Sequence, residues 1–195
     1  MALSAFIVGM SFYATELLDF GETLVGMLLV SVIVTWFLVY PFVNLLAKRF
    51  GKKLLMRLSF LSLGAMFCFI TVLGIVPIPR IVQAFGLSVL TAVPLAFIAV
   101  LDNAILGDIA KLDTEESGEA QEGMFFGSRL FVQKMGQSFA LFIFPVLTIY
   151  DTLGIRLSGV IGAVLCLVAF VIFGYYREEM ITESLASYEP GTETE

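Results

Sequence analysis

Apolar residues in this chain fall into six long runs separated by short polar or charged segments. The runs cover residues 2–18, 23–46, 54–76, 81–107, 123–149 and 157–175. A helix that crosses a bilayer needs about 20 apolar residues, with a range of roughly 17–25. No run alternates apolar and polar residues as a transmembrane barrel strand does. The pattern therefore predicts an all-α membrane protein with a six-helix bundle in residues 1–176, whose short first span begins partway into a helix.

The composition supports a lipid environment and excludes several functions. Hydrophobic residues make up 59% of the chain and charged residues 14%, whereas soluble proteins carry about 25% charged residues. A nucleic-acid partner needs a clustered basic face, and the sequence has none. Histidine is absent, and Cys68 and Cys166 lie inside apolar runs, which favours buried side chains over a disulfide or metal pair. With no nucleophile–base pair or phosphate-binding glycine loop, the sequence predicts neither an enzyme nor a cofactor.

Basic residues in the short loops predict the orientation of the spans. The densest cluster, Lys48-Arg49-Phe-Gly51-Lys52-Lys53, follows the second run. Cytoplasmic loops carry an excess of Lys and Arg, so this loop, the loop at 108–123 and the C-terminus are expected in the cytoplasm. The predicted location is the cell membrane, with an acidic, disordered tail over residues 177–195.

Small residues four positions apart predict close contacts between spans. The pairs are Gly123/Gly127, Ser158/Gly162 and Gly159/Ala163. Such spacing lets the backbones of two membrane helices approach. It is common in spans and identifies no function.

A lysine in the middle of the fifth run is the strongest candidate for a functional residue. Lys134 lies eleven positions after Gly123, which is about 16 Å along a helix axis. The hydrocarbon core is about 30 Å thick, so Lys134 is predicted near its midplane. A charge at that depth costs at least about 2.5 kcal/mol and by default faces a cavity, a partner charge or a ligand. An internal salt bridge that only joins helices is the alternative.

Other polar residues extend this candidate site along the same helix. On a helical wheel, Arg129, Gln133 and Gln137 share one face, and Lys134 lies on the flank of that face. We therefore group Lys134, Gln133 and Gln137 as the candidate cation or solute site. Arg129 is close enough to the cytoplasmic surface to extend its charge there. Asp102, at the end of the fourth run, is either a helix-end residue among headgroups or a gate charge that pairs with Arg129 or a basic loop.

The segment from Ala104 to Ser138 resembles the glycoside–pentoside–hexuronide:cation symporters, the melibiose-carrier branch of the major facilitator superfamily. The matching residues are Ala104-Ile-Leu-Gly-Asp108, Asp113, Gly118, Glu122-Gly123-Met-Phe-Phe-Gly127 and Phe131-Val-Gln-Lys134-Met-Gly136-Gln-Ser. The family pattern has an Ala-Asp at a helix end, an acidic stretch, Gly-x-Arg-x-Glu-Gly and a lysine in the next helix. The basic cluster at 48–53 is similar to the family's loop between its eighth and ninth spans.

This resemblance implies a fold and a function. The chain would correspond to the C-terminal six helices of a twelve-helix carrier that couples Na⁺ or H⁺ entry to uptake of a sugar or glycoside. The lysine beside the family's cation site would be Lys134. Asp108 would belong to the cytoplasmic gate, and we assign Glu122, Asp102 and Arg129 to the same gate.

Two departures from the family pattern define the alternatives. The arginine of Gly-x-Arg-x-Glu-Gly is Ala120 in this chain, and the N-terminal six helices, which carry the family's acidic cation ligands, have no counterpart. A half-site that faces lipid is costly, so we expect a partner, either a separately encoded N-terminal half or a second copy. The alternative function is a truncated, non-transporting membrane protein or an assembly or regulatory module.

Overall fold

The computed structural model describes residues 22–72, 79–119, 121–148 and 151–188, and every regular element in these ranges is an α-helix. The all-helical fold class is therefore confirmed for this part of the chain. The helices are α2 (Glu22–Phe50), α3 (Lys52–Val72), α4 (Arg80–Ser117), α5 (Glu122–Thr148), α6 (Asp151–Gly174) and α7 (Glu178–Tyr188).

Five helices, α2 to α6, are long and apolar enough to cross a membrane. They correspond to the predicted spans at 23–46, 54–76, 81–107, 123–149 and 157–175. The predicted span at 2–18 lies outside the described residues, so the total of six spans stays a prediction.

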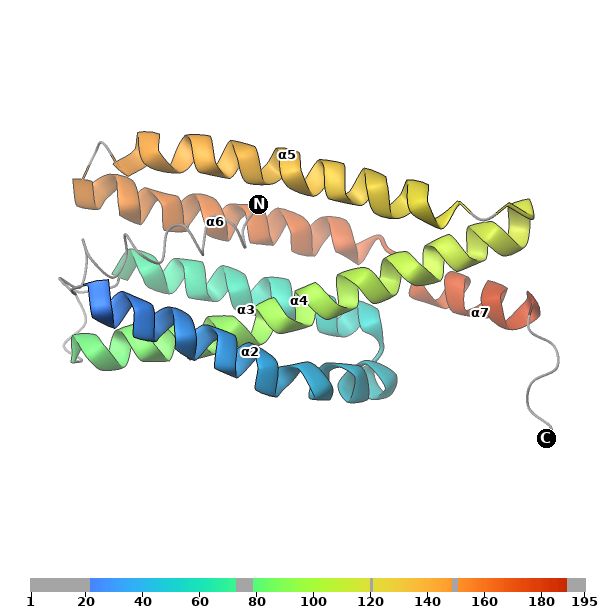
Figure 1. The fold of residues 1–195 in the computed structure, drawn as a ribbon, viewed down its shortest axis with the longest axis horizontal. Helices are drawn as coiled ribbons and strands as arrows, with labels where there is room; N and C mark the ends of the chain where they lie inside the picture. The colour runs from blue at the N-terminus through green and yellow to red at the C-terminus, as the bar shows by residue number, and fades with distance from the viewer. Residues whose placement is uncertain (1–21, 73–78, 120, 149–150, 189–195) are drawn as a thin grey trace.

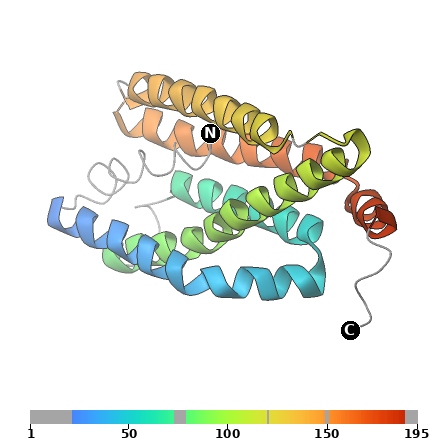
Figure 2. The ribbon, with the colours of Figure 1, turned by 45° about the vertical axis from the view of Figure 1, so that its right-hand side comes forward.

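The helices lie roughly along one common direction, and α4 crosses the others at a slant (Figure 1). Helix α3 packs extensively against α6, and α2 packs against α4, which also contacts α3. Helix α5 lies along the outer side of α6, as the turned view also shows (Figure 2). Within the described residues, α3 and α4 thus form the centre of the bundle, while α2 and α5 lie on its flanks.

Helix α4 extends well beyond the fourth predicted span. Its 38 residues have a length of about 57 Å, whereas the hydrocarbon core is about 30 Å thick. The segment after Asp108, expected to be a solvated connector, is helical as far as Ser117. Gly118 ends the helix in a left-handed conformation (φ 74°) and donates its N–H to the Thr114 carbonyl oxygen at 3.0 Å. Ala110, two residues after Asp108, is still buried, so α4 continues to pack against the bundle beyond the predicted span.

The C-terminal segment also differs from the expectation of disorder over residues 177–195. Residues Glu178–Tyr188 form helix α7, which contacts α4 at the end of the bundle where α4 protrudes (Figure 1). The Glu178 carboxylate accepts hydrogen bonds from backbone amides at the start of α3. This contact with a distant part of the chain orders a segment whose own composition predicts no structure. Residues 189–195 lie outside the described part.

Two apolar clusters hold the helices together. The larger cluster joins α2, α3, α4 and α6 and consists of Val25, Leu28, Leu63, Phe67, Ile70, Ala84, Leu87, Leu95, Ala163 and Cys166. The second cluster lies toward the end that carries α7 and consists of Val43, Leu55, Met56, Leu101 and Ile105, with Phe173 and Tyr176 packed on it. The expectation of burial holds for Cys166, whereas Cys68 is exposed.

Glycines in α6 allow its close approach to α3. A Cβ atom on Gly159 would lie 2.9 Å from the backbone oxygen of Phe67, and one on Gly162 would lie 2.6 Å from the Phe67 ring. Both distances are too short for real contacts, so α3 occupies the space that side chains would need. The predicted pair Gly123/Gly127 behaves differently, because a Cβ atom on either residue would meet nothing within 4 Å.

We predict that Gly159→Ala destabilises the protein by about 1–3 kcal/mol, because its methyl group would push against backbone rather than a movable side chain. The measurement is thermal unfolding in detergent. Gly127→Ala is the matched control, since its methyl group enters open space and alanine favours helix formation. Equal stability of the two variants would refute the close α3–α6 contact.

Candidate functional site

Lys134 lies near the midpoint of the 27-residue helix α5, so its predicted depth near the bilayer midplane stays a prediction. Its side chain is exposed, and it lines an open depression of about 620 Å³ together with Phe131, Met135, Ser138, Phe139 and Phe142. The Ser138 hydroxyl donates to the Lys134 carbonyl oxygen at 3.0 Å, and its oxygen can still accept a hydrogen bond. Among the described residues Lys134 forms no ion pair, and apart from Ser138 the depression offers its ammonium group an apolar, mostly aromatic wall.

The two glutamines of the predicted site do not line this depression. Gln133 and Gln137 are half-buried, on the side of α5 that also carries Arg129 and the buried Gly136. Round the helix Lys134 lies about 100° from Gln133 and about 60° from Gln137, and its exposure puts it on the outward-facing side. The grouping of Lys134, Gln133 and Gln137 as one cation or solute site therefore stays a prediction that depends on what covers the outer face of α5.

A salt bridge connects α4 and α5 at the cytoplasmic end of the predicted topology. Arg129 Nε donates to Asp102 Oδ2 at 2.9 Å, and Arg129 Nη2 bonds the same oxygen. Two environments were expected for Asp102, headgroups or a pair with a cation, and the structure shows its carboxylate paired with Arg129. Two donors from one guanidinium group give this contact a more defined geometry than a lysine would.

A second salt bridge connects α3 and α4 nearby. Lys52 Nζ bonds Asp108 Oδ2, and both side chains are partly exposed. The arginine of the family pattern, which would supply a cation for Asp108, is Ala120 in this chain. Lys52, from the predicted basic loop, provides that cation instead. Glu122 is the first residue of α5, and its side chain is exposed.

Arg57 has an environment that its position beside the basic cluster did not indicate. Its guanidinium carbon lies 4.5 Å from the centre of the Phe170 ring on α6, and its Nε atom is buried without a hydrogen-bond partner among the described residues. A cation over an aromatic face is stabilised by the ring's quadrupole. The available signal was position, since Arg57 lies more than one helical turn inside α3, whereas the cations of the cluster lie in the last turn of α2 or at the start of α3.

These charged side chains divide into two classes. Lys52, Asp108, Asp102 and Arg129, toward the end that carries α7, are paired across helices, whereas Lys134, near the middle of α5, forms no ion pair among the described residues. Within the described ranges no group of three metal-ligating side chains comes together. Charge pairs between helices and a cation within an apolar span are features that ion and solute pathways use.

The comparisons with known proteins agree with this arrangement. A family model described as MFS/sugar transport protein matches residues 2–160. No curated protein and no solved structure matches the chain. The match covers most of the chain, including the predicted first span and helices α2 to α5.

We predict that Asp102→Asn and Arg129→Gln each lower the stability by about 1 kcal/mol or less, because solvent screens a half-exposed pair. The double variant should lose no more than the worse single variant, since the two changes remove one interaction. Thermal unfolding in detergent measures this, with Asp113→Asn on the same helix as the control. Additive losses would show that Asp102 and Arg129 stabilise the protein independently.

Proposed function

The chain belongs to the MFS/sugar transport protein family, and from this premise we propose that it is one half of a cation-coupled sugar or glycoside carrier. In this proposal it forms the C-terminal half of a melibiose-carrier-like symporter and works with a second half in the cell membrane. Carriers of this superfamily move one half against the other around a site near the bilayer midplane.

The single observation that carries the proposal is the environment of Lys134. Its ammonium group lies at mid-span, is exposed, and has no ionic partner among the described residues. Facing lipid, it would cost at least about 2.5 kcal/mol. A watery crevice shared with a second bundle removes this cost. The carboxylates that bind the coupling cation, Na⁺ or H⁺, would then come from that second bundle.

Uneven burial of the spans supports the need for a partner half. In the most apolar stretch of α4, 50% of the residues are buried, compared with 39% in α3 and only 6% in both α2 and α5. The two flanking helices therefore present most of their surface outward. Lipid can cover the apolar part, but it does not satisfy Lys134 on α5. The partner is an N-terminal half-subunit or a second copy of this chain.

The two salt bridges provide a cytoplasmic gate for alternating access. Asp102–Arg129 connects α4 to α5, and Lys52–Asp108 connects α3 to α4. Both contacts are partly exposed, so water can compete for these charges when the helices separate. The positive-inside pattern places this end, with α7, in the cytoplasm.

One observation favours the alternative, a non-transporting membrane protein with an assembly or regulatory role. The described spans offer no acidic side chain at the depth of Lys134, so the described residues do not by themselves complete a cation site. A protein that only assembles with others could use the same exposed faces of α2 and α5.

We predict that Lys134→Ala reduces cation-driven solute uptake by the assembled carrier to background. The change removes the only cation at mid-span of α5. Because alanine places no charge in the hydrocarbon region, the amount of protein in the membrane should not fall. Uptake into energised vesicles, with quantified membrane protein, measures both effects. Lys48→Ala, which removes an exposed surface lysine, should retain uptake. Full cation-driven uptake by Lys134→Ala would remove the assigned role.

We further predict that cation-stimulated flux requires a partner. Vesicles with this chain alone would then show flux only if it forms a homodimer, and otherwise only together with an N-terminal half. Cysteine crosslinking from exposed Phe142, on the Lys134 face of α5, should trap the partner, whereas crosslinking from Leu153 on α6 should not. Absence of flux in every preparation would favour the alternative function.

A further inference from the structure

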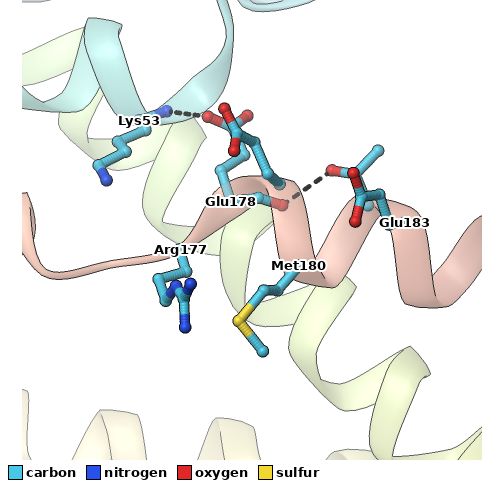
Figure 3. Close-up of a pocket in the computed structure, with 7 residues that line it drawn as sticks. Lys53, Arg177, Glu178, Met180 and Glu183 are labelled. Atoms are coloured by element: carbon cyan, nitrogen blue, oxygen red, sulfur yellow. Dashed lines mark hydrogen bonds between the residues drawn. The ribbon is translucent and has the colours of Figure 1, made fainter.

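The first residue of α7 caps a helix from a distant part of the chain. The Glu178 carboxylate accepts hydrogen bonds from the backbone N–H groups of Lys52, at 2.7 Å, and Lys53, at 2.8 Å. Figure 3 shows the bond from Lys53. Lys52 and Lys53 are the first two residues of α3. The first N–H groups of a helix have no partner within the helix and carry partial positive charge. A carboxylate with one oxygen on each amide satisfies both requirements.

The chain between α2 and α3 offers no cap of its own. Gly51 alone separates the two helices and has a left-handed backbone (φ 82°), with its N–H donated to the Ala47 oxygen at 3.0 Å. A side chain at this position usually caps the next helix, and glycine has none. A Cβ atom on Gly51 would lie 3.3 Å from Glu178 Oε2, so the absence of a side chain also leaves room for the distant carboxylate.

Lys52 connects this cap to the proposed gate. Its backbone N–H binds Glu178 of α7, and its ammonium group binds Asp108 of α4. Tyr176, two residues before α7, packs on the second apolar cluster and stacks on Phe173 with 5.1 Å between ring centres. Burial, and then the negative charges of Asp108 and Glu178, raise the pKa of Tyr176 to about 12. The phenol therefore stays neutral and adds no competing charge beside Lys52.

We propose that Glu178 is a positioning residue of the cytoplasmic gate, which fixes the first turn of α3 so that the Lys52 ammonium group remains on Asp108. In this arrangement α7 is a latch, and its release frees the Lys52–Asp108 pair and opens the cytoplasmic end. The opening rests on the proposed function, because it is a step of alternating access. The cap itself rests only on the geometry of Glu178 and α3.

The first test measures the cap without any transport assay. In Glu178→Ala, hydrogen exchange at the Lys52 and Lys53 amides should accelerate on the order of tenfold or more, because bonds to a charged acceptor are lost. Glu179→Ala is the matched control, since this exposed neighbour on the same turn makes no such bond. Glu178→Gln, which keeps one acceptor oxygen, should give a smaller acceleration and is the milder variant if Glu178→Ala folds poorly.

The second test measures the gate in the full chain, in membranes with its partner. With both native cysteines replaced by alanine, Asn103→Cys on α4 reports cytoplasmic access through its reaction with a membrane-impermeant maleimide. Glu178→Ala and Lys52→Gln should each raise the labelling rate several-fold, because each change frees Asp108 from the Lys52 ammonium group. Lys52→Gln removes that ammonium group but keeps the capped amide. The double variant should label no faster than Lys52→Gln alone, since both changes act through one pair. A change in helix stability alone would not produce this non-additivity.

Distinct outcomes separate the two proposals. Unchanged amide exchange in Glu178→Ala overturns the cap. Labelling of Glu178→Ala that equals Glu179→Ala, or additive effects of Glu178→Ala and Lys52→Gln, overturns the positioning role. If the exchange and labelling experiments give the expected results while no preparation transports solute, the latch is supported and the proposed transport function is refuted.

Discussion

The structure depends on one constraint, which is that a charge inside a bilayer needs a partner because lipid offers none. The charges at the end that carries α7 meet this constraint within the chain. Arg129 bonds Asp102, Lys52 bonds Asp108, and Arg57 lies over Phe170. Lys134 does not meet it within the described residues, and its exposure on α5 is the reason to treat the chain as part of a larger assembly.

The end that carries α7 concentrates contacts that hold separate helices in register. One residue, Lys52, joins α3 to α4 through its side chain and to α7 through its backbone. The second apolar cluster lies at the same end, with Phe173 and Tyr176 packed on it. The polar contacts can separate without unfolding the bundle, because the buried area that stabilises the helices lies elsewhere. This combination suits the proposed cytoplasmic gate.

The hydrophobic pattern was sufficient to predict α2, α3, α5 and α6, since each crosses the membrane as one apolar run. The hydrophobic pattern did not predict the end of α4 or helix α7, because the acidic residues in these segments indicated a solvated, irregular chain. Those helices are held by Gly118, which caps α4, and by Glu178, whose partner lies 126 positions away. The position of Lys134 near the middle of α5 could be predicted from the helical rise per residue. Its separation from the glutamines could not be predicted, because packing against α6 decides which side of α5 is covered.

Symmetry constrains which partner can cover Lys134. In a two-fold homodimer each surface meets its own copy, so an interface centred on the outer face of α5 would bring two ammonium groups into one crevice. Like charges in a medium of low dielectric repel strongly, and such a dimer would require an anion between them. A distinct N-terminal half has no such restriction, because it can place carboxylates opposite a single Lys134. Because Lys134 has no ionic partner among the described residues, its charge favours a partner with a different sequence. The carboxylates that Lys134 requires from that partner are the same groups that would bind a coupling cation.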